Sequence, residues 1–528
     1  MPKFSIVVPT RNRANTLLYT LKTCLNQQDF DDYEVIVSDN FSDDDIADVV
    51  EALGSDKVRY FKTDAPLAMT DHWNFAIDKA KGEYIMFLGS DDGIHSYGLY
   101  ALNQIVSLTG EKVVQWNANH YTWPCVRSTN SNVFCIHDFN NKPQFININA
   151  KSLVKDVVGY KQPVNRLPMI YYRSIIHRSL TDELKSITSA VFDSTNPDYY
   201  SSFAILSLIQ SFIDISLPIA ASGISGNSNG GSHNSNVKTS TINEFLLLNN
   251  QSGKISRSNF FDGGILSLVD YIIANDFIAA KRNLNAYDDI EIDYTLHIKA
   301  VINERYGFYM FKGDEGKASF QEELKLIEKI IRDDNVLSSC FDGSGLDIQN
   351  YTFLPPEYDA APHINNDLLR IDLTSMEIDN IYDAINFAEK LLYPRKRIDF
   401  YLKRFKESWE SLGRVNQFYE KLRSFDKVGL YAVGRHSDRL IEGYRSYCGD
   451  TKRFFMFDSN ELKWGQEHLG IKVLPPHSIP EQNLDALVIS SFRFQNEIFE
   501  SVKQYSNDLK IIKLYGKDGE DLPPNYFV

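Results

Sequence analysis

Short apolar runs alternate with longer segments of helical spacing through the first hundred residues. Four runs rich in β-branched and aromatic residues predict strands; they are residues 4–8, 33–37, 58–61 and 84–88. Between them, apolar residues recur three and four positions apart, as they do in helices; these segments are residues 14–26, 43–53 and 69–81. Strands that alternate with helices in this way predict an α/β fold with a doubly wound, mostly parallel sheet.

Polar residues follow three of these strands directly. The three clusters are Pro9-Thr10-Arg11-Asn12, Ser38-Asp39-Asn40 and Ser90-Asp91-Asp92. Parallel strands bring their carboxyl ends to one edge of the sheet, which is where open α/β sheets bind ligands. Two adjacent carboxylates at that edge supply the hard oxygen ligands that Mg²⁺ or Mn²⁺ prefers. We therefore expect a single site, built from three segments, that suits a metal-bound diphosphate.

Glycines bracket the aspartate doublet, and the doublet has a second interpretation. Gly89 and Gly93 lack a Cβ and would let a ligand approach the backbone closely. Taken alone, however, the same residues describe a polar turn that ends a strand and starts the next helix. The agreement between the motif and the predicted topology favours the ligand site over the turn.

The rest of the chain divides into two further regions. After a run rich in Gly, Ser and Asn at residues 222–234, which predicts a flexible loop, the apolar spacing is mostly helical to about residue 425. Strands and helices alternate again from Lys427. The patterns predict three domains: residues 1–240, a helical middle domain at 241–425, and a small Rossmann-like domain at 426–528. In the last of these, Gly434 lacks the second and third glycines of a dinucleotide motif, so we favour scaffolding over nucleotide binding there.

Composition narrows the class of partner. The net charge of −15 argues against a nucleic-acid-binding protein. Five widely spaced cysteines, with no Cys-x-x-Cys pair, are typical of a reduced protein. The chain enters a strand by Phe4, which leaves no room for a signal peptide, and its longest apolar stretch, residues 204–221, is interrupted by polar residues and a proline. We expect a cytoplasmic protein, with any membrane contact peripheral and on the inner face.

A basic segment at residues 394–406 keeps helical apolar spacing. A basic amphipathic helix can rest on anionic lipid. Such a helix more often packs its apolar face inward and leaves its lysines in water, and we favour that interpretation.

The first 240 residues resemble glycosyltransferase family 2, the inverting nucleotide-sugar transferases of GT-A fold. The resemblance rests on three stretches in order: residues 5–13 (SIVVPTRNR), 34–43 (EVIVSDNFSD) and 80–92 (AKGEYIMFLGSDD). It implies a first nucleotide-binding loop formed by Pro9, Thr10, Arg11 and Asn12. It also implies that Asp39 hydrogen-bonds the base, commonly uracil, and that Asn74 lies on the donor-binding helix. Its neighbour Trp73 is equally well explained as a core residue.

In this resemblance Ser90, Asp91 and Asp92 correspond to the family's Asp-x-Asp region. Gly89 stands where the family often has its first aspartate, so we expect Asp92 to be the direct ligand of Mn²⁺ or Mg²⁺, with Asp91 in support. The cation would stabilise the negative charge that develops on the departing diphosphate. His233, in the glycine-rich run, is a candidate to complete the metal shell; a solvated linker histidine is the plainer explanation.

An inverting transfer needs a base for the proton of the acceptor hydroxyl. Asp198 is our candidate, because a Pro-Asp followed by aromatics resembles the acceptor-side segment of some family members. Helix chemistry explains the same residues equally well, with Asn196 as N-cap and Pro197 at the first helical position. Asp193 is the nearest substitute. Weaker candidates for an acceptor cleft are Arg166, Tyr171, Tyr172 and Arg173.

The sequence thus predicts a metal-dependent, inverting glycosyltransferase that uses a nucleotide-sugar donor, with UDP as the expected nucleotide. The expected acceptor is a glycan or lipid-linked glycan of a bacterial surface polysaccharide such as capsule or lipopolysaccharide. Two alternatives stay open: a second activity in the C-terminal domain, and a sugar-nucleotide-binding scaffold whose catalytic machinery has decayed, suggested by Gly89. Assembly into a homo-oligomer is also open.

Overall fold

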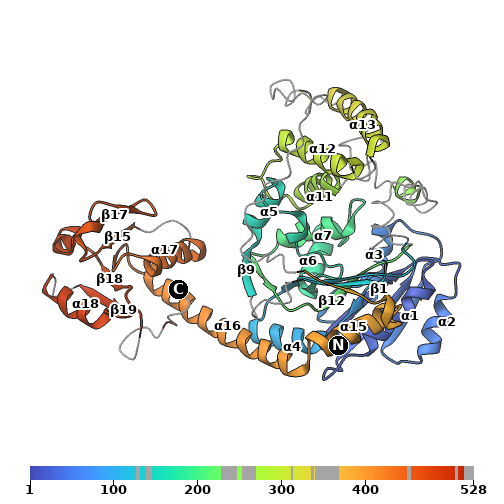
Figure 1. Ribbon diagram of the computed structural model, residues 1–528, viewed down its shortest axis with the longest axis horizontal. Coiled ribbons are helices and arrows are strands. Elements are labelled where there is room, and N and C mark those ends of the chain that lie inside the picture. The colour runs from blue at the N-terminus through green and yellow to red at the C-terminus, as the bar shows by residue number, and fades with distance from the viewer. Residues whose placement is uncertain are drawn as a thin grey trace. The chain divides into compact units, whose positions relative to one another are not determined.

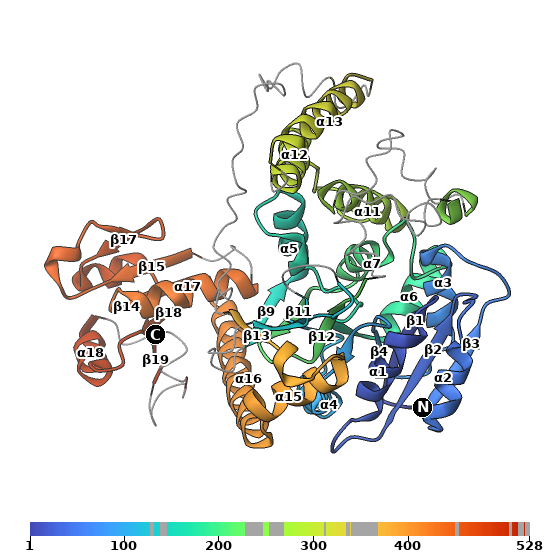
Figure 2. The same ribbon diagram turned by 45° about the vertical axis from the view of Figure 1, so that its right-hand side comes forward.

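The alternating pattern of the first hundred residues folds into a parallel sheet with helices on both faces (Figure 1). Its first four strands are β1 (Phe4–Thr10), β2 (Tyr33–Asp39), β3 (Val58–Lys62) and β4 (Tyr84–Phe87). They lie in the order β3-β2-β1-β4, and every neighbouring pair is parallel. The connecting helices are α1 (Ala14–Leu25), α2 (Ile46–Leu53) and α3 (Met69–Ile77). Figure 2 shows α1 and α2 on one side of these strands and α3 on the other.

The structure is a computed structural model. It describes residues 1–126, 131–137, 145–226, 247–252, 269–310, 313–333, 338, 368–448, 453–505, 509–515 and 522. Contacts group the chain into two compact units, residues 1–402 and 403–528. The predicted division into three domains stays a prediction.

Four more strands extend the sheet of the first unit to eight. They are β10 (Ser174–His177), β6 (Val113–Trp116), β11 (Ser211–Ile215) and β9 (Phe145–Asn149). Strand β10 lies antiparallel between β4 and β6, while β11 is parallel to β6. The predicted α/β fold with a mainly parallel sheet, as expected for a GT-A fold, is confirmed. Its core gathers apolar residues of β1, β4 and α3 with those of later helices, for example Val7, Phe87 and Trp73.

A second, five-stranded sheet lies next to the aspartate doublet. In order, its strands are β13 (Leu368–Asp372), β8 (Val133–His137), β7 (Asn119–Thr122), β12 (Ala220–Ile224) and β5 (Gly93–Ile94). The prediction of a flexible loop from residue 222 is therefore wrong for residues 222–224, which belong to β12. Gly223 is small enough for this strand to pack directly against the carbonyl oxygen of Asp91. The remainder of that run, from residue 227, lies outside the described residues.

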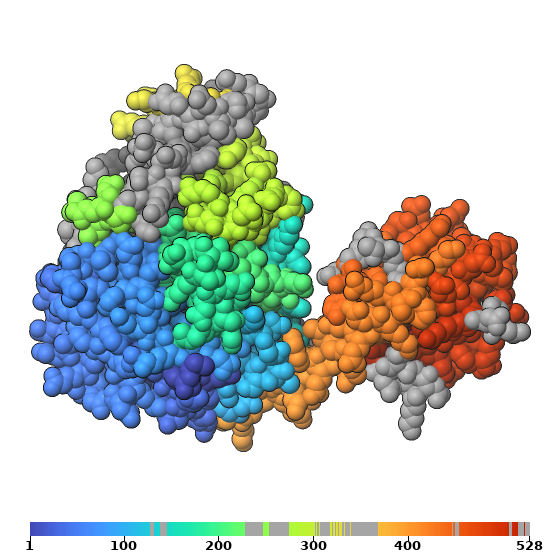
Figure 3. Space-filling model, turned by 180° about the vertical axis from the view of Figure 1, so that it is seen from behind, coloured from blue at the N-terminus to red at the C-terminus, as the bar shows by residue number. Residues whose placement is uncertain are grey.

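The other helices of the first unit surround the sheets. They are α4 (Gly98–Thr109), α5 (Ala150–Val158), α6 (Arg178–Thr188), α7 (Pro197–Leu206), α11 (Val269–Leu284), α12 (Tyr294–Met310), α13 (Gly313–Asp333) and α15 (Ile381–Leu392). Helix α11 packs on α7, and Figure 3 shows its yellow-green surface directly above the green surface of the α7 region. Helix α15 packs against α1 and β5, where Glu389 accepts hydrogen bonds from the backbone and hydroxyl of Ser96. Helices from the predicted middle region thus build part of the first unit.

Strands and helices alternate in the second unit, as the sequence predicts for a Rossmann-like domain. Its sheet has the order β16 (Glu467–His468), β17 (Ile471–Leu474), β15 (Arg453–Phe457), β14 (Lys427–Tyr431), β18 (Ala486–Ile489), β19 (Lys510–Lys513). All neighbouring pairs are parallel except β16 with β17. Helices α17 (Arg435–Cys448) and α18 (Gln495–Val502) follow β14 and β18, and α16 (Arg395–Arg423) leads into this unit.

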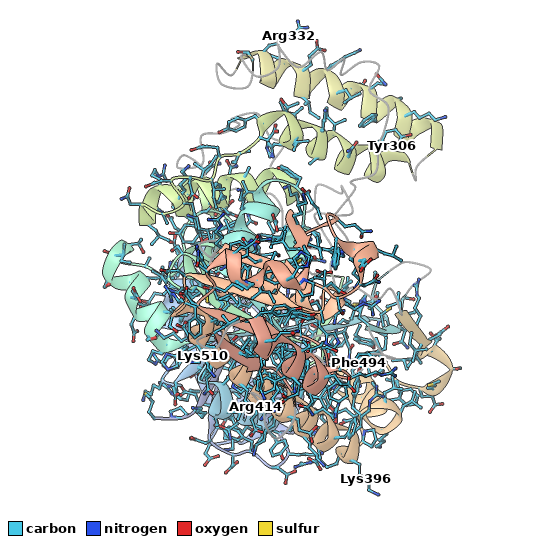
Figure 4. The ribbon with its side chains drawn as sticks, turned by 90° about the vertical axis from the view of Figure 1, so that its left-hand side faces the viewer. Tyr306, Arg332, Lys396, Arg414, Phe494 and Lys510 are labelled. Atoms are coloured by element: carbon cyan, nitrogen blue, oxygen red, sulfur yellow. The ribbon has the colours of Figure 1, made fainter. Side chains whose placement is uncertain are left out.

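The apolar face of α16 packs inward, as favoured from the sequence: Ile398 and Tyr401 are buried. Lys396 points away from the helix into solvent (Figure 4). Among the described residues, no helix combines the length and the apolar character needed to cross a bilayer.

Candidate functional site

The carboxyl ends of β1, β2 and β4 bring the three polar clusters of the sequence to one edge of the sheet. Thr10 at the end of β1 pairs with Asp39 at the end of β2. Beyond them, Arg11 donates a hydrogen bond to the carbonyl oxygen of Asn40. Arg13 reaches across to the doublet, with its Nη1 atom 3.6 Å from Oδ1 of Asp91. Segments far apart in the sequence therefore converge as predicted, because parallel strands end on the same side.

Asp92 is buried, and the protein itself uses both of its carboxylate oxygens. Oδ2 accepts the backbone N–H of Gly89 at 2.9 Å, and Oδ1 accepts that of Gly223 at 2.7 Å. The hydroxyl of Tyr171 bonds the same carboxylate. Burial and the neighbouring charge of Asp91 raise the pKa of Asp92, while these three donors act against that rise. Asp92 thus links the turn after β4 to strand β12.

Asp91 has two neighbours of a different kind, Ser225 just after β12 and Arg13 in the loop that follows β1. Its Oδ2 atom accepts the hydroxyl of Ser225 at 2.6 Å. For Oδ1, the contact described is the cation of Arg13 at 3.6 Å, which is longer than a hydrogen bond. The carbonyl oxygen of Asp91 accepts the indole N–H of Trp123 at 3.0 Å, which fixes the backbone on which this carboxylate stands.

Two buried hydroxyls at this edge lack partners. Oγ1 of Thr10 and Oγ of Ser90 have no hydrogen-bond partner among the described residues. Buried polar atoms are normally paired, so unpaired ones call for a ligand or water. Both belong to clusters that the sequence assigns to nucleotide binding, and they are donors suited to phosphate oxygens.

Asp39 is fully buried at the end of β2. Its carboxylate accepts the hydroxyl of Tyr60 at 2.7 Å and the backbone N–H of Ser42 at 2.8 Å, with Lys62 Nζ 3.6 Å away. These bonds fix the conformation of the loop that follows β2. That Asp39 reads the base stays a prediction, and so does the nucleotide-binding role of the segment from Pro9 to Asn12.

Asn74 lies on α3 but is occupied by the protein. Its amide donates to the carbonyl oxygen of Phe192 at 2.8 Å and accepts the backbone N–H groups of Val191 and Phe192, each at 3.1 Å. Its proposed role in donor binding stays a prediction. Trp73 is a core residue, 5% exposed, with its ring stacked on Phe87.

Asp198 is half-buried in the first turn of α7. Pro197 holds the first helical position as expected, but Asn196 makes no side-chain bond to the helix N-terminus. Burial raises the pKa of Asp198 to about 6, against the lowering effect of nearby backbone N–H groups. A carboxyl group that is ionised at neutral pH and titrates this close to it suits a general base. Asp193, the substitute, accepts a bond from Asn283 of α11 at 2.8 Å.

Sequence reasoning missed three elements around these residues. Ser225 and Gly223 hold the doublet but sit in a run dominated by Gly, Ser and Asn, which carries no strand signal. Asp276 on α11 is fully buried beside Asp198, with the side chain of Ser194 as its hydrogen-bonding neighbour. The bond from Tyr171, a candidate for the acceptor cleft, to Asp92 also has no signal in the sequence. Asp276 is a lone acidic residue in a helical apolar pattern, which gives no sign that its side chain is buried.

The residues that could hold a divalent cation are few. Across the described ranges, no three His, Cys, Asp or Glu side chains lie close enough together to hold a metal ion. His233 is outside the described residues. Mg²⁺-type sites commonly use one or two carboxylates and take their remaining ligands from substrate phosphates and water. A carboxylate oxygen of Asp91 near the loop that follows β1, together with the unpaired hydroxyls of Thr10 and Ser90, fits a cation that arrives with a diphosphate.

Comparison with known proteins places these features in context. Residues 5–155 match the model of glycosyl transferase family 2. The chain is 40% identical, over 107 residues, to the GalNAc(5)-diNAcBac-PP-undecaprenol beta-1,3-glucosyltransferase of Campylobacter jejuni, which covers 20% of this chain and 34% of that protein. It is 30% identical, over 121 residues, to the UDP-Glc:alpha-D-GlcNAc-diphosphoundecaprenol beta-1,3-glucosyltransferase WfaP of Escherichia coli, covering 23% of this chain and 47% of that one.

Another relative is the amylovoran biosynthesis glycosyltransferase AmsB of Erwinia amylovora, 34% identical over 96 residues, or 17% of this chain and 32% of that protein. The chain therefore matches between about a third and a half of the length of these relatives. Among solved structures, residues 1–349 of S. aureus TarS in complex with UDP-GlcNAc align over 56% of this chain and 86% of that chain, at 17% identity and a TM-score of 0.35. A similarity this slight carries no further weight.

Proposed function

Because residues 5–155 belong to glycosyltransferase family 2, we propose that this chain moves a sugar from a nucleotide-diphosphate donor to a hydroxyl group of an acceptor glycan. The observation that carries the proposal is the edge of the sheet where β1, β2 and β4 end. There the loop after β1 and the turn after β4 bring together a buried aspartate doublet, the cation of Arg13 close to Asp91, and the unpaired buried hydroxyls of Thr10 and Ser90. This combination suits a diphosphate and its counter-ion, and a purely structural turn would not need it.

UDP is the proposed nucleotide. The loop from Pro9 to Asn12 would surround the diphosphate and nucleoside, with Asp39 directed at the base. Support comes from the position of these residues at the ligand-binding edge and from the name of WfaP, a relative that uses UDP-Glc.

We propose Asp91, rather than Asp92, as the carboxylate that meets the cation, Mn²⁺ or Mg²⁺. This reverses the roles expected from the sequence. It is supported by the hydrogen bonds: Asp92 is committed to Gly89 and Gly223, whereas Oδ1 of Asp91 faces the nucleotide loop. Bound there, a divalent cation would supply Lewis-acid stabilisation of the diphosphate leaving group. Arg13 adds a fixed positive charge on the same side.

Transfer with inversion needs attack on the face of the anomeric carbon opposite the diphosphate, by an acceptor hydroxyl that gives up its proton to a base. The acceptor hydroxyl loses its proton to the carboxylate of Asp198, its oxygen bonds the anomeric carbon, and the bond from that carbon to the diphosphate oxygen breaks with its electron pair on the diphosphate. The pKa of Asp198, raised by burial to about 6, leaves it ionised at neutral pH but more basic than a free aspartate. We propose Asp198 as this base.

The proposed acceptor is a glycan of a bacterial surface polysaccharide, or its lipid-linked precursor. The names of two relatives specify diphosphoundecaprenol-linked acceptors, and a third is named for amylovoran biosynthesis. A lipid-linked acceptor would call for a cytoplasmic protein that meets the membrane peripherally. Exposed Phe400 and Lys396 on α16 are consistent with such contact, which cosedimentation with vesicles containing anionic lipid would test.

For the unit at residues 403–528 we propose a scaffolding role. In a dinucleotide-binding domain the acidic residue after the second strand must be available to a ribose. Here Asp458 accepts the backbone N–H groups of Val433 and Asn460, each at 2.9 Å, and is paired with Lys463 at 2.9 Å. A second activity that uses NAD would require these bonds to open.

A donor screen tests the function. Purified full-length protein is incubated with a panel of UDP-sugars, with and without EDTA, and release of UDP is measured. Metal-dependent release supports the enzyme. Tight binding of a UDP-sugar with no release in the presence of surface-glycan acceptors would instead indicate the scaffold, and absence of binding to every nucleotide sugar would refute the proposal.

A further inference from the structure

Gly89 is a glycine because of what packs against it. Its φ lies outside the left-handed region, so its backbone conformation would accept a side chain. A Cβ built at this position, however, would overlap the hydroxyl oxygen of Tyr171 and lie 2.7 Å from Oδ2 of Asp92. Real Cβ atoms essentially never approach other atoms so closely. The space beside Gly89 is therefore filled by protein, and the expectation that it admits a ligand is wrong.

The same holds for Gly93, where a Cβ would lie 2.5 Å from Ile385 of α15. Both glycines that bracket the doublet thus serve close packing within the protein. Between them, the turn is held by donors that arrive from three distant segments: Gly223 of β12, Thr20 of α1 and Tyr171.

Tyr171 is itself firmly placed. The segment that contains it pairs with the end of β4, where Tyr172 donates its N–H to the carbonyl oxygen of Phe87 at 2.7 Å and Phe87 donates to that of Ile170 at 3.0 Å. The ring of Tyr171 packs on Trp73, with 5.5 Å between centroids. The phenol of Tyr171, protonated at neutral pH as a tyrosine ordinarily is, donates a hydrogen bond to the carboxylate of Asp92.

The two aspartates divide their tasks as a result. With Gly89, Gly223 and Tyr171 all donating to Asp92, that carboxylate is directed inward. Its neighbour Asp91 is directed toward Arg13 and the nucleotide loop. Of the three donors described for the carboxylate of Asp92, Tyr171 is the only side chain, so it is the one that a substitution can remove cleanly.

We propose that Tyr171 is a positioning residue for the aspartate doublet: its hydroxyl fills the space beside Gly89 and holds Asp92 inward, so that Asp91 is the carboxylate presented to a diphosphate-bound cation. This rests on the proposed function for the identity of the ligand. The steric relation between Gly89 and Tyr171 does not depend on any ligand.

The first test measures binding of UDP to the full chain by calorimetry, in Mn²⁺ and in EDTA. Replacing Tyr171 by Phe removes the donor to Asp92 and keeps the ring. We expect Tyr171→Phe to reduce the gain in UDP affinity that Mn²⁺ provides by about tenfold, the loss of one hydrogen bond to a charged group. Affinity in EDTA, which reports the nucleoside contacts, should be unchanged.

The matched control is Tyr97→Phe. Tyr97 is also buried and donates its hydroxyl to a backbone carbonyl, that of Pro218, at 2.8 Å, but it does not touch the doublet. It should leave the Mn²⁺-dependent gain as in the wild type even if it costs similar stability. An equal gain in Tyr171→Phe and the wild type would overturn the proposal, as would an equal loss in Tyr97→Phe and Tyr171→Phe.

The second test needs no ligand. Gly89→Ala should lower the melting temperature strongly in the wild type and clearly less in the Tyr171→Phe background, because the nearest obstacle to its Cβ is gone. Additive effects of the two substitutions would refute the steric relation. If the wild type binds no UDP in either condition, the proposed function fails, whereas this non-additivity still decides whether Tyr171 and Gly89 are coupled.

Discussion

Replacing each aspartate of the doublet by asparagine should separate stability from ligand binding. In Asp92→Asn the amide oxygen can accept only one of the two backbone N–H groups, of Gly89 and Gly223, that now bond the carboxylate. The amide nitrogen must then face the other backbone N–H group, and because both are hydrogen-bond donors, that N–H group is left unpaired. A buried donor left unpaired costs about 1–3 kcal/mol, and with one weakened bond we expect a total loss of about 2–4 kcal/mol.

In Asp91→Asn the cost should be smaller. Its amide can still accept the hydroxyl of Ser225, and the substitution removes only a charge interaction with Arg13 at 3.6 Å. We expect a change within about 1 kcal/mol, because the lost attraction to Arg13, which makes no direct hydrogen bond to Oδ1, is offset by relief of the repulsion between the two buried carboxylates. The same substitution removes the carboxylate proposed to meet the cation, so Mn²⁺-dependent binding of UDP should disappear.

The assay is urea unfolding of the full chain, followed by the fluorescence of tryptophans such as Trp123, whose indole bonds the doublet. It is paired with UDP binding in Mn²⁺. Asp92→Asn should unfold at lower urea and Asp91→Asn near the wild type. The opposite pattern, a stable Asp92→Asn that has lost Mn²⁺-dependent binding beside an Asp91→Asn that has kept it, would refute the assignment of the two roles.

Three further predictions concern residues away from the doublet. Asp198→Asn should abolish transfer while leaving donor binding intact. The wild-type rate of transfer should fall as the pH drops below about 6, because burial raises the pKa of Asp198 to that value. A rate of transfer that is independent of pH between 5 and 7 would exclude Asp198 as the base. Burial raises the pKa of Asp276 well above that of an unfolded aspartate, about 3.9, so the folded state holds its proton more tightly and loses stability as the pH rises past that value. Asp276→Asn stays neutral, so its free energy of unfolding relative to that of the wild type should increase from pH 4 to pH 7. The same difference between variant and wild type at pH 4 and at pH 7 would contradict this. Burial acts to raise the pKa of Glu389, but the hydrogen bonds from His95 and Ser96 outweigh it and lower that pKa. These hydrogen bonds should therefore stabilise the fold above about pH 4.5 and weaken as the pH falls through the folded pKa. Glu389→Ala removes these bonds and should lower the free energy of unfolding by about 3 kcal/mol at pH 7, and by much less at low pH, in a urea titration. A loss of stability that did not change with pH would show that packing alone is lost.

Local pattern was enough to predict the sheet edge at which the candidate site lies. The runs that became β1, β2 and β4 alternate with helices, and chirality and crossover rules then place their carboxyl ends together. Nothing beyond the first hundred residues was needed to bring Thr10, Asp39 and Asp91 to one edge.

What the sequence could not predict depends on contacts between distant segments. Gly223 lies 131 positions from the carboxylate of Asp92 that accepts its N–H, and no local signal marks such a bond. The same applies to Tyr171, whose partner is chosen by the pairing of its segment with β4, and to Asp276, buried only because α11 packs on α7. The ligand role was assigned to Asp92 from the motif alone, whereas the direction of each carboxylate is set by these distant donors.

A crystal structure of the protein with UDP and Mn²⁺ tests the central claim most directly. Anomalous scattering would locate the cation independently of the nucleotide. We predict a Mn²⁺ ion bound by the carboxylate of Asp91 and by the diphosphate of UDP, at the edge where β1, β2 and β4 end, with Asp92 still bonded to Gly89 and Gly223. UDP bound elsewhere in the chain, or a cation not bound by Asp91, would contradict the account.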